Sequence, residues 1–197
     1  MVTKRPMFLR YGVTTLLGAV ALVAIPACTA PHVATPLTAK LGKDDPDTQL
    51  EFWHQLELQP MTSHDDAFHG FLLYLDGADS SPDYAARVAT LKKRDLLPAS
   101  FNRPADEAIE RGTLAVMICE AVDLKGGVTY SLLGPTPRYA VRELQYVGLY
   151  PLSTPNQIFT GAEYLGIMGR LEDYQRGNAA DKPASEMLPP AEKTPEK

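Results

Sequence analysis

Two histidines and two aspartates stand within six positions, and their side chains are of the kind that bind metal ions or move protons. They are His64, Asp65, Asp66 and His69. A zinc site needs three or four such ligands converging on one point. On a helix, residues 65 and 69 share one face, whereas residues 64 and 66 point elsewhere. We therefore expect no metal centre here, because helix capping and the helix dipole explain acids directly after Ser63.

Patterns that support covalent or phosphoryl-transfer chemistry are missing from the sequence. It contains no Gly-Xaa-Ser-Xaa-Gly elbow and no cysteine with a histidine partner. Gly126-Gly127 follows a predicted helix rather than a strand, which is the wrong order for a phosphate-binding loop. The paired acids Asp106-Glu107 and Glu172-Asp173 diverge on a helix and are expected to be solvated. We expect a protein that is not an enzyme and that carries no cofactor.

The first 28 residues have the layout of a secretory signal. Three basic residues come first, residues 11–27 carry no charge, and a small residue precedes Cys28. The last four of these residues, Ile25-Pro26-Ala27-Cys28, resemble the lipobox of bacterial lipoproteins. The resemblance implies a signal peptide over 1–27 and acyl chains on Cys28, palmitate among them, which would bind the protein to a membrane. Plain secretion and an uncleaved membrane helix remain as alternatives.

The balance of charges limits the partners of the processed chain. After residue 27 there remain 16 basic and 24 acidic residues, a net charge of −8 with histidine neutral. An acidic protein is a poor partner for phosphate backbones, so no nucleic acid is expected. Thr29 follows the lipidation site where, by resemblance to enterobacterial lipoproteins, an Asp would retain the protein at the inner membrane. We expect a lipid-anchored envelope protein at the outer membrane, facing the periplasm.

Composition divides the chain after the signal into three parts. Residues 28–47 are rich in proline and polar residues and predict a tether. Residues 177–197 have the same character and predict a disordered tail. The folded domain is then 48–176. It has no disulfide if Cys28 is acylated, and Cys119 lies in an apolar run where a buried structural thiol is expected.

Helical periodicity runs through this domain and predicts an all-α fold of about six helices. Ser63 caps one helix and Gly77 ends it; Pro82 opens the next at its first helical position. Residues 111–122 are apolar on three sides and predict a central helix. The last helix opens on the capping box formed by Thr160 and Glu163.

Two segments of the domain repeat. Four residues of the first recur 53 positions later, with Val88, Leu91, Leu96 and Pro98 matching Val141, Leu144, Leu149 and Pro151. Residues 109–114 match residues 159–164 at a shift of 50. The unit is a helix, a turn with leucine before proline, an irregular stretch and a second, buried helix. A more distant third copy would cover residues 53–75.

This unit resembles the S-layer homology repeat, in which an Ile-Thr-Arg-Ala-Glu signature opens the second helix. Ile109-Glu110-Arg111-Gly112 keeps the aliphatic residue and the arginine, and Phe159-Thr160-Gly161-Ala162-Glu163 keeps Thr, Ala and Glu. Glu110 replaces the family's threonine, and Gly161 replaces its arginine. The resemblance implies packed helix pairs that bind polymers of the bacterial envelope, and it makes Arg111 a ligand-contacting residue.

These observations lead to one principal hypothesis and two alternatives. The principal hypothesis is a non-catalytic cell-envelope lipoprotein whose helical domain binds a cell-wall polymer or another envelope protein. The first alternative is an adaptor in the assembly of a secretion or surface-polymer complex. The second is an enzyme, or an enzyme accessory, that acts on cell wall or glycan.

Overall fold

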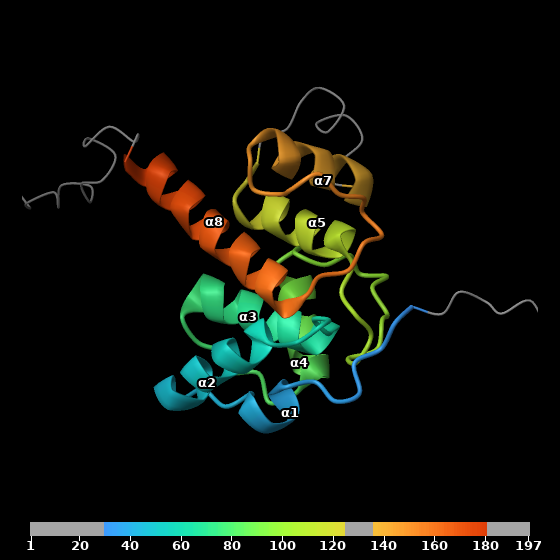
Figure 1. Cartoon of the computed structure of the whole chain (residues 1–197), viewed down its shortest axis with the longest axis vertical. Coiled ribbons are helices and arrows are strands. Elements are labelled where there is room, and N and C mark those ends of the chain that lie inside the picture. The colour runs from blue at the N-terminus through green and yellow to red at the C-terminus, as the bar shows by residue number, and fades with distance from the viewer. Residues whose placement is uncertain (1–29, 125–135, 181–197) are drawn as a thin grey trace, which may run out of the picture.

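The computed structural model describes residues 30–124 and 136–180, with side chains to residue 177. Within these ranges every regular element is a helix and there is no strand (Figure 1). The all-α prediction is therefore confirmed. The helices are α1 (Thr38–Leu41), α2 (Pro46–Glu57), α3 (His64–Asp76), α4 (Tyr84–Lys93), α5 (Arg111–Ala121), α7 (Pro137–Tyr146) and α8 (Gly161–Ala180).

Side-chain caps fix where the first helices begin. The Asp45 carboxylate accepts a hydrogen bond from the Thr48 amide at 2.9 Å, so α2 starts at Pro46. The Ser63 hydroxyl accepts one from the Asp66 amide at 3.0 Å and starts α3, as predicted. Gly77 ends α3 in the left-handed conformation, with φ of 72°. Helix α4 starts later than predicted, because Asp83 is its N-cap and Pro82 lies outside it.

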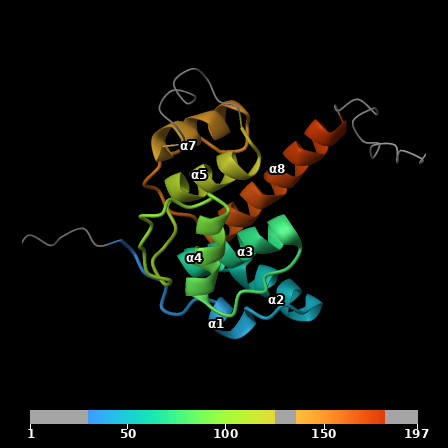
Figure 2. The ribbon, with the colours of Figure 1, turned by 180° about the vertical axis from the view of Figure 1, so that it is seen from behind.

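The helices pack in two groups joined by α8. Helix α5 packs along α7, and α3 packs against α4. Helix α8 runs obliquely between these groups, and its first turn meets α2 (Figures 1 and 2). Helix α5 has seven buried residues, which confirms its predicted central position. Cys119 on this helix is buried, as expected, with its Sγ atom 3.9 Å from the Ala140 carbonyl oxygen.

The turns that end α4 and α7 have the same backbone geometry. Asp95 and Gly148, 53 positions apart, both adopt the left-handed conformation, with φ of 59° and 79°. The next amides, of Leu96 and Leu149, then donate to the Leu91 and Leu144 carbonyls. The turn after α5 has the same form, with Asp123 at a φ of 47° and the Leu124 amide donating to the Cys119 carbonyl, so this turn shape is not specific to the leucine and proline spacing. A common repeat, and its S-layer homology character, stays a prediction.

The segments that open α3, α5 and α8 meet at the centre of the molecule. The Thr62 amide donates to the Phe159 carbonyl at 2.9 Å, and the Ile109 amide donates to the Thr62 carbonyl at 2.9 Å. The Arg111 amide donates to the Gln157 carbonyl at 2.7 Å. These backbone bonds satisfy amide groups that would otherwise be buried without partners at the helix starts.

The tether predicted over 28–47 is wrong for the part that the structure describes. Residues 30–47 lie against the domain and include α1 and the start of α2. Pro31 accepts from the Ala108 amide at 2.9 Å, and Val33 donates to the Asp106 carbonyl at 2.7 Å. Local composition concealed this order, because the partners lie more than 70 positions away in the sequence.

The C-terminal boundary also differs from the expected one. Helix α8 continues to Ala180, so residues 177–180 are helical rather than part of a tail. The remainder of the predicted tail, residues 181–197, and the predicted signal, residues 1–27, lie outside the described residues. Within 30–124 and 136–180, no helix has both the length and the apolar character needed to span a bilayer.

Candidate functional site

The polar cluster near position 65 is buried and holds helices together. The Thr38 hydroxyl donates to the Asp65 carboxylate at 2.6 Å, and the Thr38 amide donates to Asp66 at 3.0 Å. Asp66 also accepts from the Ser63 hydroxyl at 2.7 Å. Burial raises the pKa of Asp66 in spite of these hydrogen bonds. The two acids therefore attach α1 to the start of α3, while the Ser63 hydroxyl caps α3 through the Asp66 amide.

The cluster continues through two residues that sequence reasoning missed, Asp79 and Arg87. Arg87 Nε donates to Asp79 at 2.5 Å, and its Nη1 donates to Asp65 at 2.7 Å. His69 Nδ1 lies 2.6 Å from the same Asp79 oxygen. Burial alone would raise the pKa of Asp79, but hydrogen bonds from His69 and Arg87 outweigh it and hold that pKa well below its usual range.

This network has the geometry of a structural cross-link. His64 and His69 do not converge on a common point with the aspartates, because His64 packs against the rings of Phe68 and Phe101. Among the residues that the structure describes, no three His, Cys, Asp or Glu side chains are placed to hold a metal ion.

The buried ring of His64 predicts a pH-dependent stability. Burial, with a smaller contribution from Arg103, lowers the pKa of His64 from 6.5 to about 4. The unfolded chain therefore takes up a proton before the folded protein does, and stability falls as the pH drops from 7 towards 4. Between pH 7 and pH 5 this single group accounts for about 2 kcal/mol of the loss.

Urea unfolding at several pH values measures this effect. The His64→Phe variant, which keeps an aromatic ring beside Phe68 and Phe101, is expected to lose about 2 kcal/mol less than the wild type over that interval. The control is His54→Gln, since His54 is exposed on α2. If the free energy of unfolding fell by the same amount between pH 7 and pH 5 in the wild type and in His64→Phe, His64 would not be the group responsible.

Arg111 is not available for the ligand-contacting role that the resemblance implies. Its Nη2 donates to the Glu163 carboxylate at 2.6 Å, and its guanidinium lies 4.8 Å from the centre of the Phe159 ring. The side chain is only 7% exposed. Arg111 thus joins the start of α5 to the start of α8. The capping box of α8 is confirmed, because the Thr160 amide donates to Glu163 and the Glu163 amide donates to the Thr160 hydroxyl.

The paired acids of the sequence have separate roles. Asp106 lies 3.2 Å from His32 Nδ1, while Glu107 is buried and accepts from Arg103 at 2.7 Å. The expectation of a solvated pair is therefore wrong at Glu107. Glu172 and Asp173 are both exposed on α8, as expected. Neither pair forms a converging acid–base site. Cys28, the predicted lipidation site, lies outside the described residues.

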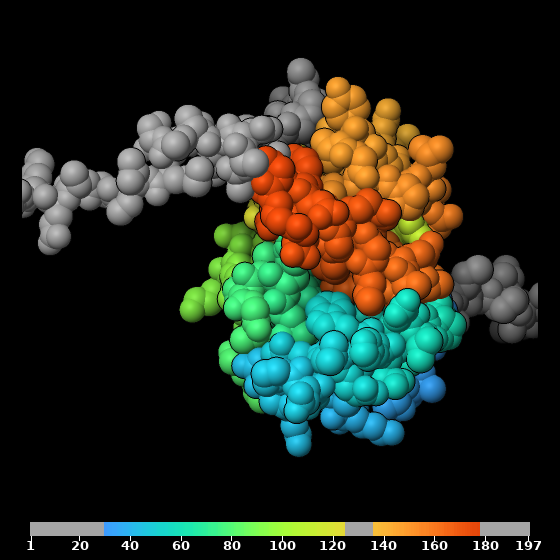
Figure 3. Space-filling model, turned by 60° about the vertical axis from the view of Figure 1, so that its left-hand side comes forward, coloured from blue at the N-terminus to red at the C-terminus, as the bar shows by residue number. Residues whose placement is uncertain are grey.

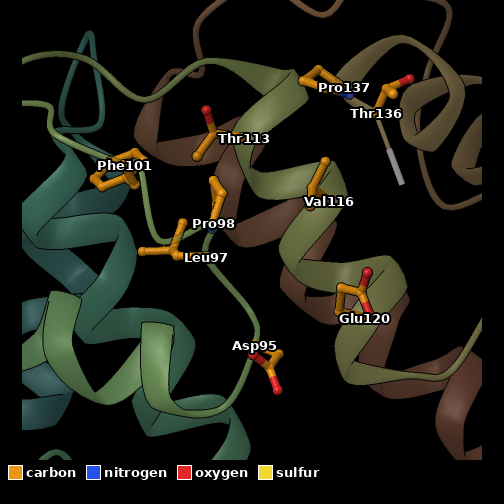
Figure 4. Close-up of a pocket in the computed structure, with 9 residues that line it drawn as sticks. All are labelled: Asp95, Leu97, Pro98, Phe101, Thr113, Val116, Glu120, Thr136 and Pro137. Atoms are coloured by element: carbon orange, nitrogen blue, oxygen red, sulfur yellow. The ribbon is translucent and has the colours of Figure 1, made fainter. Parts of the chain in front are cut away.

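An open cleft of about 470 Å³ lies between the segment after α4 and the outer face of α5 (Figure 4). Its apolar surface comes mainly from Leu97, Pro98, Phe101, Val116 and Pro137. Thr113, Val116 and Glu120 stand on one face of α5 at helical spacing and form one wall. This volume falls within the range of about 300–1,000 Å³ that is usual for binding sites.

Two carboxylates give the cleft its electrostatic character. Asp95 and Glu120 lie at the same end of it, and both are exposed (Figure 4). The described residues that line the cleft include no Lys, Arg or His. Asp95 holds a left-handed φ of 59°, whereas the equivalent turn after α7 has glycine, which adopts this conformation without strain. The sequence carried a signal for this site, since Asp95 aligns with Gly148 in the repeat.

Comparison with protein-family models, with curated proteins and with solved structures found no match for this chain.

Proposed function

We propose that this chain is a non-catalytic lipoprotein of the bacterial cell envelope that binds a polypeptide segment of another envelope protein. The acylated Cys28 would supply the membrane attachment, and the cleft between α4 and α5 would receive the segment. The observation that carries the proposal is the lining of this cleft, where an apolar surface adjoins two carboxylates and the described lining residues include no cation.

The chemistry of the cleft discriminates between the partners expected from the sequence. A pyruvylated or phosphate-bearing wall polymer is anionic and would be repelled by Asp95 and Glu120. A peptide can place an apolar side chain against Phe101 and Val116 and extend a lysine or arginine to the carboxylates.

A displayed library of random peptides, selected against the purified domain, tests this proposal. We expect the selected pool to be enriched in lysine or arginine at a fixed spacing from an apolar residue. In the Glu120→Lys variant this preference should weaken or reverse towards Asp and Glu. For one selected peptide, Glu120→Gln should weaken binding about two- to fivefold, as expected for an exposed charge pair.

Two controls make the test decisive. Glu57→Lys reverses an exposed charge at the end of α2, away from the cleft, and should leave the selected sequences unchanged. A pool without preference for cations, or co-sedimentation with peptidoglycan sacculi that is unaffected by Glu120→Lys, would refute the peptide site. Palmitate labelling that persists in Cys28→Ala would refute the anchor.

A further inference from the structure

A second cleft, of about 580 Å³, lies on another face of the molecule, where α8 crosses α2 and α3. Figure 3 views the molecule from the side on which α8 lies across these helices. Two aromatic residues line this cleft, Trp53 from α2 and Tyr74 from α3. Polar groups come from Gln49 on α2 and from the α8 residues Glu172 and Gln175.

The two aromatic side chains are held in fixed positions. A Cβ atom added to Gly70 would lie only 2.9 Å from the six-membered ring of Trp53, so this ring rests directly on the backbone of α3. Trp53 also makes an edge contact with Phe52 at 5.2 Å between ring centroids. Tyr74 stacks on Phe71, and within the described residues its buried hydroxyl has no hydrogen-bond partner. Such rings offer a preformed apolar surface.

The polar groups of the cleft are suited to hydroxyl groups rather than to anions. Gln49 donates through Nε2 to Asp44 at 2.7 Å, which leaves its amide oxygen as an acceptor. Gln175 supplies a further side-chain amide, and Glu172 a carboxylate. The described lining residues include no Lys or Arg, so an anionic ligand would find no counter-charge among them.

We propose that this cleft binds an uncharged oligosaccharide. The C–H face of a pyranose ring is apolar and stacks on aromatic rings, while its hydroxyls form hydrogen bonds with amide and carboxylate groups. Trp53 and Tyr74 would take the first role, and Gln49, Glu172 and Gln175 the second. No heavy atom lies within 4 Å of the position that a Cβ at Gly169 would take, so the wall formed by α8 leaves room for a ring. This site is separate from the peptide cleft.

The single tryptophan of the chain makes the test direct, because all tryptophan emission reports on this cleft. The purified protein is titrated with chitotetraose and with cellotetraose, both uncharged. We expect a saturable change in Trp53 emission with at least one of them, with a Kd below about 1 mM. Gln175→Ala should weaken this binding about fivefold to tenfold, through the loss of one hydrogen bond.

A matched pair of substitutions on α8 separates binding from folding. Gly169→Leu fills the cleft and should weaken binding at least about tenfold. Gly166→Leu adds the same side chain to the same helix, where the structure also leaves open space but outside the cleft lining, and should bind as the wild type does. Both variants should keep the far-UV circular dichroism of the parent. The proposal would be overturned if neither sugar changed the Trp53 emission. It would also be overturned if Gly169→Leu and Gly166→Leu weakened binding equally.

Discussion

Replacing Arg87 with methionine is expected to lower the free energy of unfolding by about 3–5 kcal/mol. The guanidinium is buried and bridges two carboxylates, those of Asp79 and Asp65, and no other cationic side chain takes its place in the described contacts. Its loss leaves Asp79 with His69 as its remaining side-chain partner and Asp65 with the Thr38 hydroxyl. Uncompensated buried charge is among the few changes that destabilise a protein this much.

Urea unfolding at pH 7 measures the effect, and the chain offers a matched control. Arg94, about two turns further along at the C-cap of α4, also pairs with an aspartate, but its partner Asp76 and its own side chain are about 40% exposed. Arg94→Met should therefore cost no more than about 1 kcal/mol. Similar losses for the two variants would show that the buried network contributes little beyond an ordinary surface pair.

Introducing a methyl group at Gly161 is expected to cost about 3 kcal/mol or more. A Cβ at this position would lie 1.5 Å from the Leu56 carbonyl oxygen, a main-chain atom that cannot rotate away. The start of α8 would have to separate from the end of α2, although the Gly161 amide is hydrogen-bonded to the Gln59 carbonyl at 2.9 Å. We expect Gly161→Ala to shift the urea midpoint downward by several times more than an average substitution.

Gly166→Ala, five residues further along α8, is the control for this experiment. No atom lies within 4 Å of its added methyl group, so the higher helix propensity of alanine should stabilise the protein by up to about 1 kcal/mol. The two substitutions should thus differ in sign. A destabilisation of Gly161→Ala no larger than that of Gly166→Ala would contradict the close approach of α2 and α8.

The same close approach bears on the predicted resemblance to S-layer homology repeats. The resemblance to S-layer homology repeats places an arginine where this chain has Gly161. The Leu56 backbone occupies the space into which any side chain would extend. At the equivalent opening of α5, Arg111 is present but is paired with Glu163 and covered by Phe159. Neither position presents a guanidinium to solvent.

Local signals in the sequence were enough to predict α3, α5 and α8. The Ser63 cap, the Gly77 stop and the capping box of Thr160 and Glu163 each depend on residues within four positions of one another, and each is present in the structure. The apolar character of residues 111–122 on three sides likewise indicated a central helix, and seven residues of α5 are buried.

Local signals of this kind could not predict contacts between residues that lie far apart in the sequence. Thr38 lies in a segment whose proline-rich composition predicts disorder, yet it bonds to Asp65 and Asp66, 27 and 28 positions away. Asp79 and Arg87 are eight positions apart in the sequence, and both are buried where α3 packs against α4. The cleft beside α5 depends on the turn at Asp95, whose alignment with Gly148 was visible but whose neighbours across the cleft were not.

The attachment of Pro31 and Val33 to the loop before α5 has a consequence for the height of the protein above a bilayer. Three residue steps separate Cys28 from Pro31, and an extended chain covers at most about 10 Å in that distance. If Cys28 carries acyl chains, the domain has almost no slack. The domain would lie close to the lipid headgroups, with the segment around Ala108 facing the bilayer. Its orientation would be set by the fold rather than by a flexible linker.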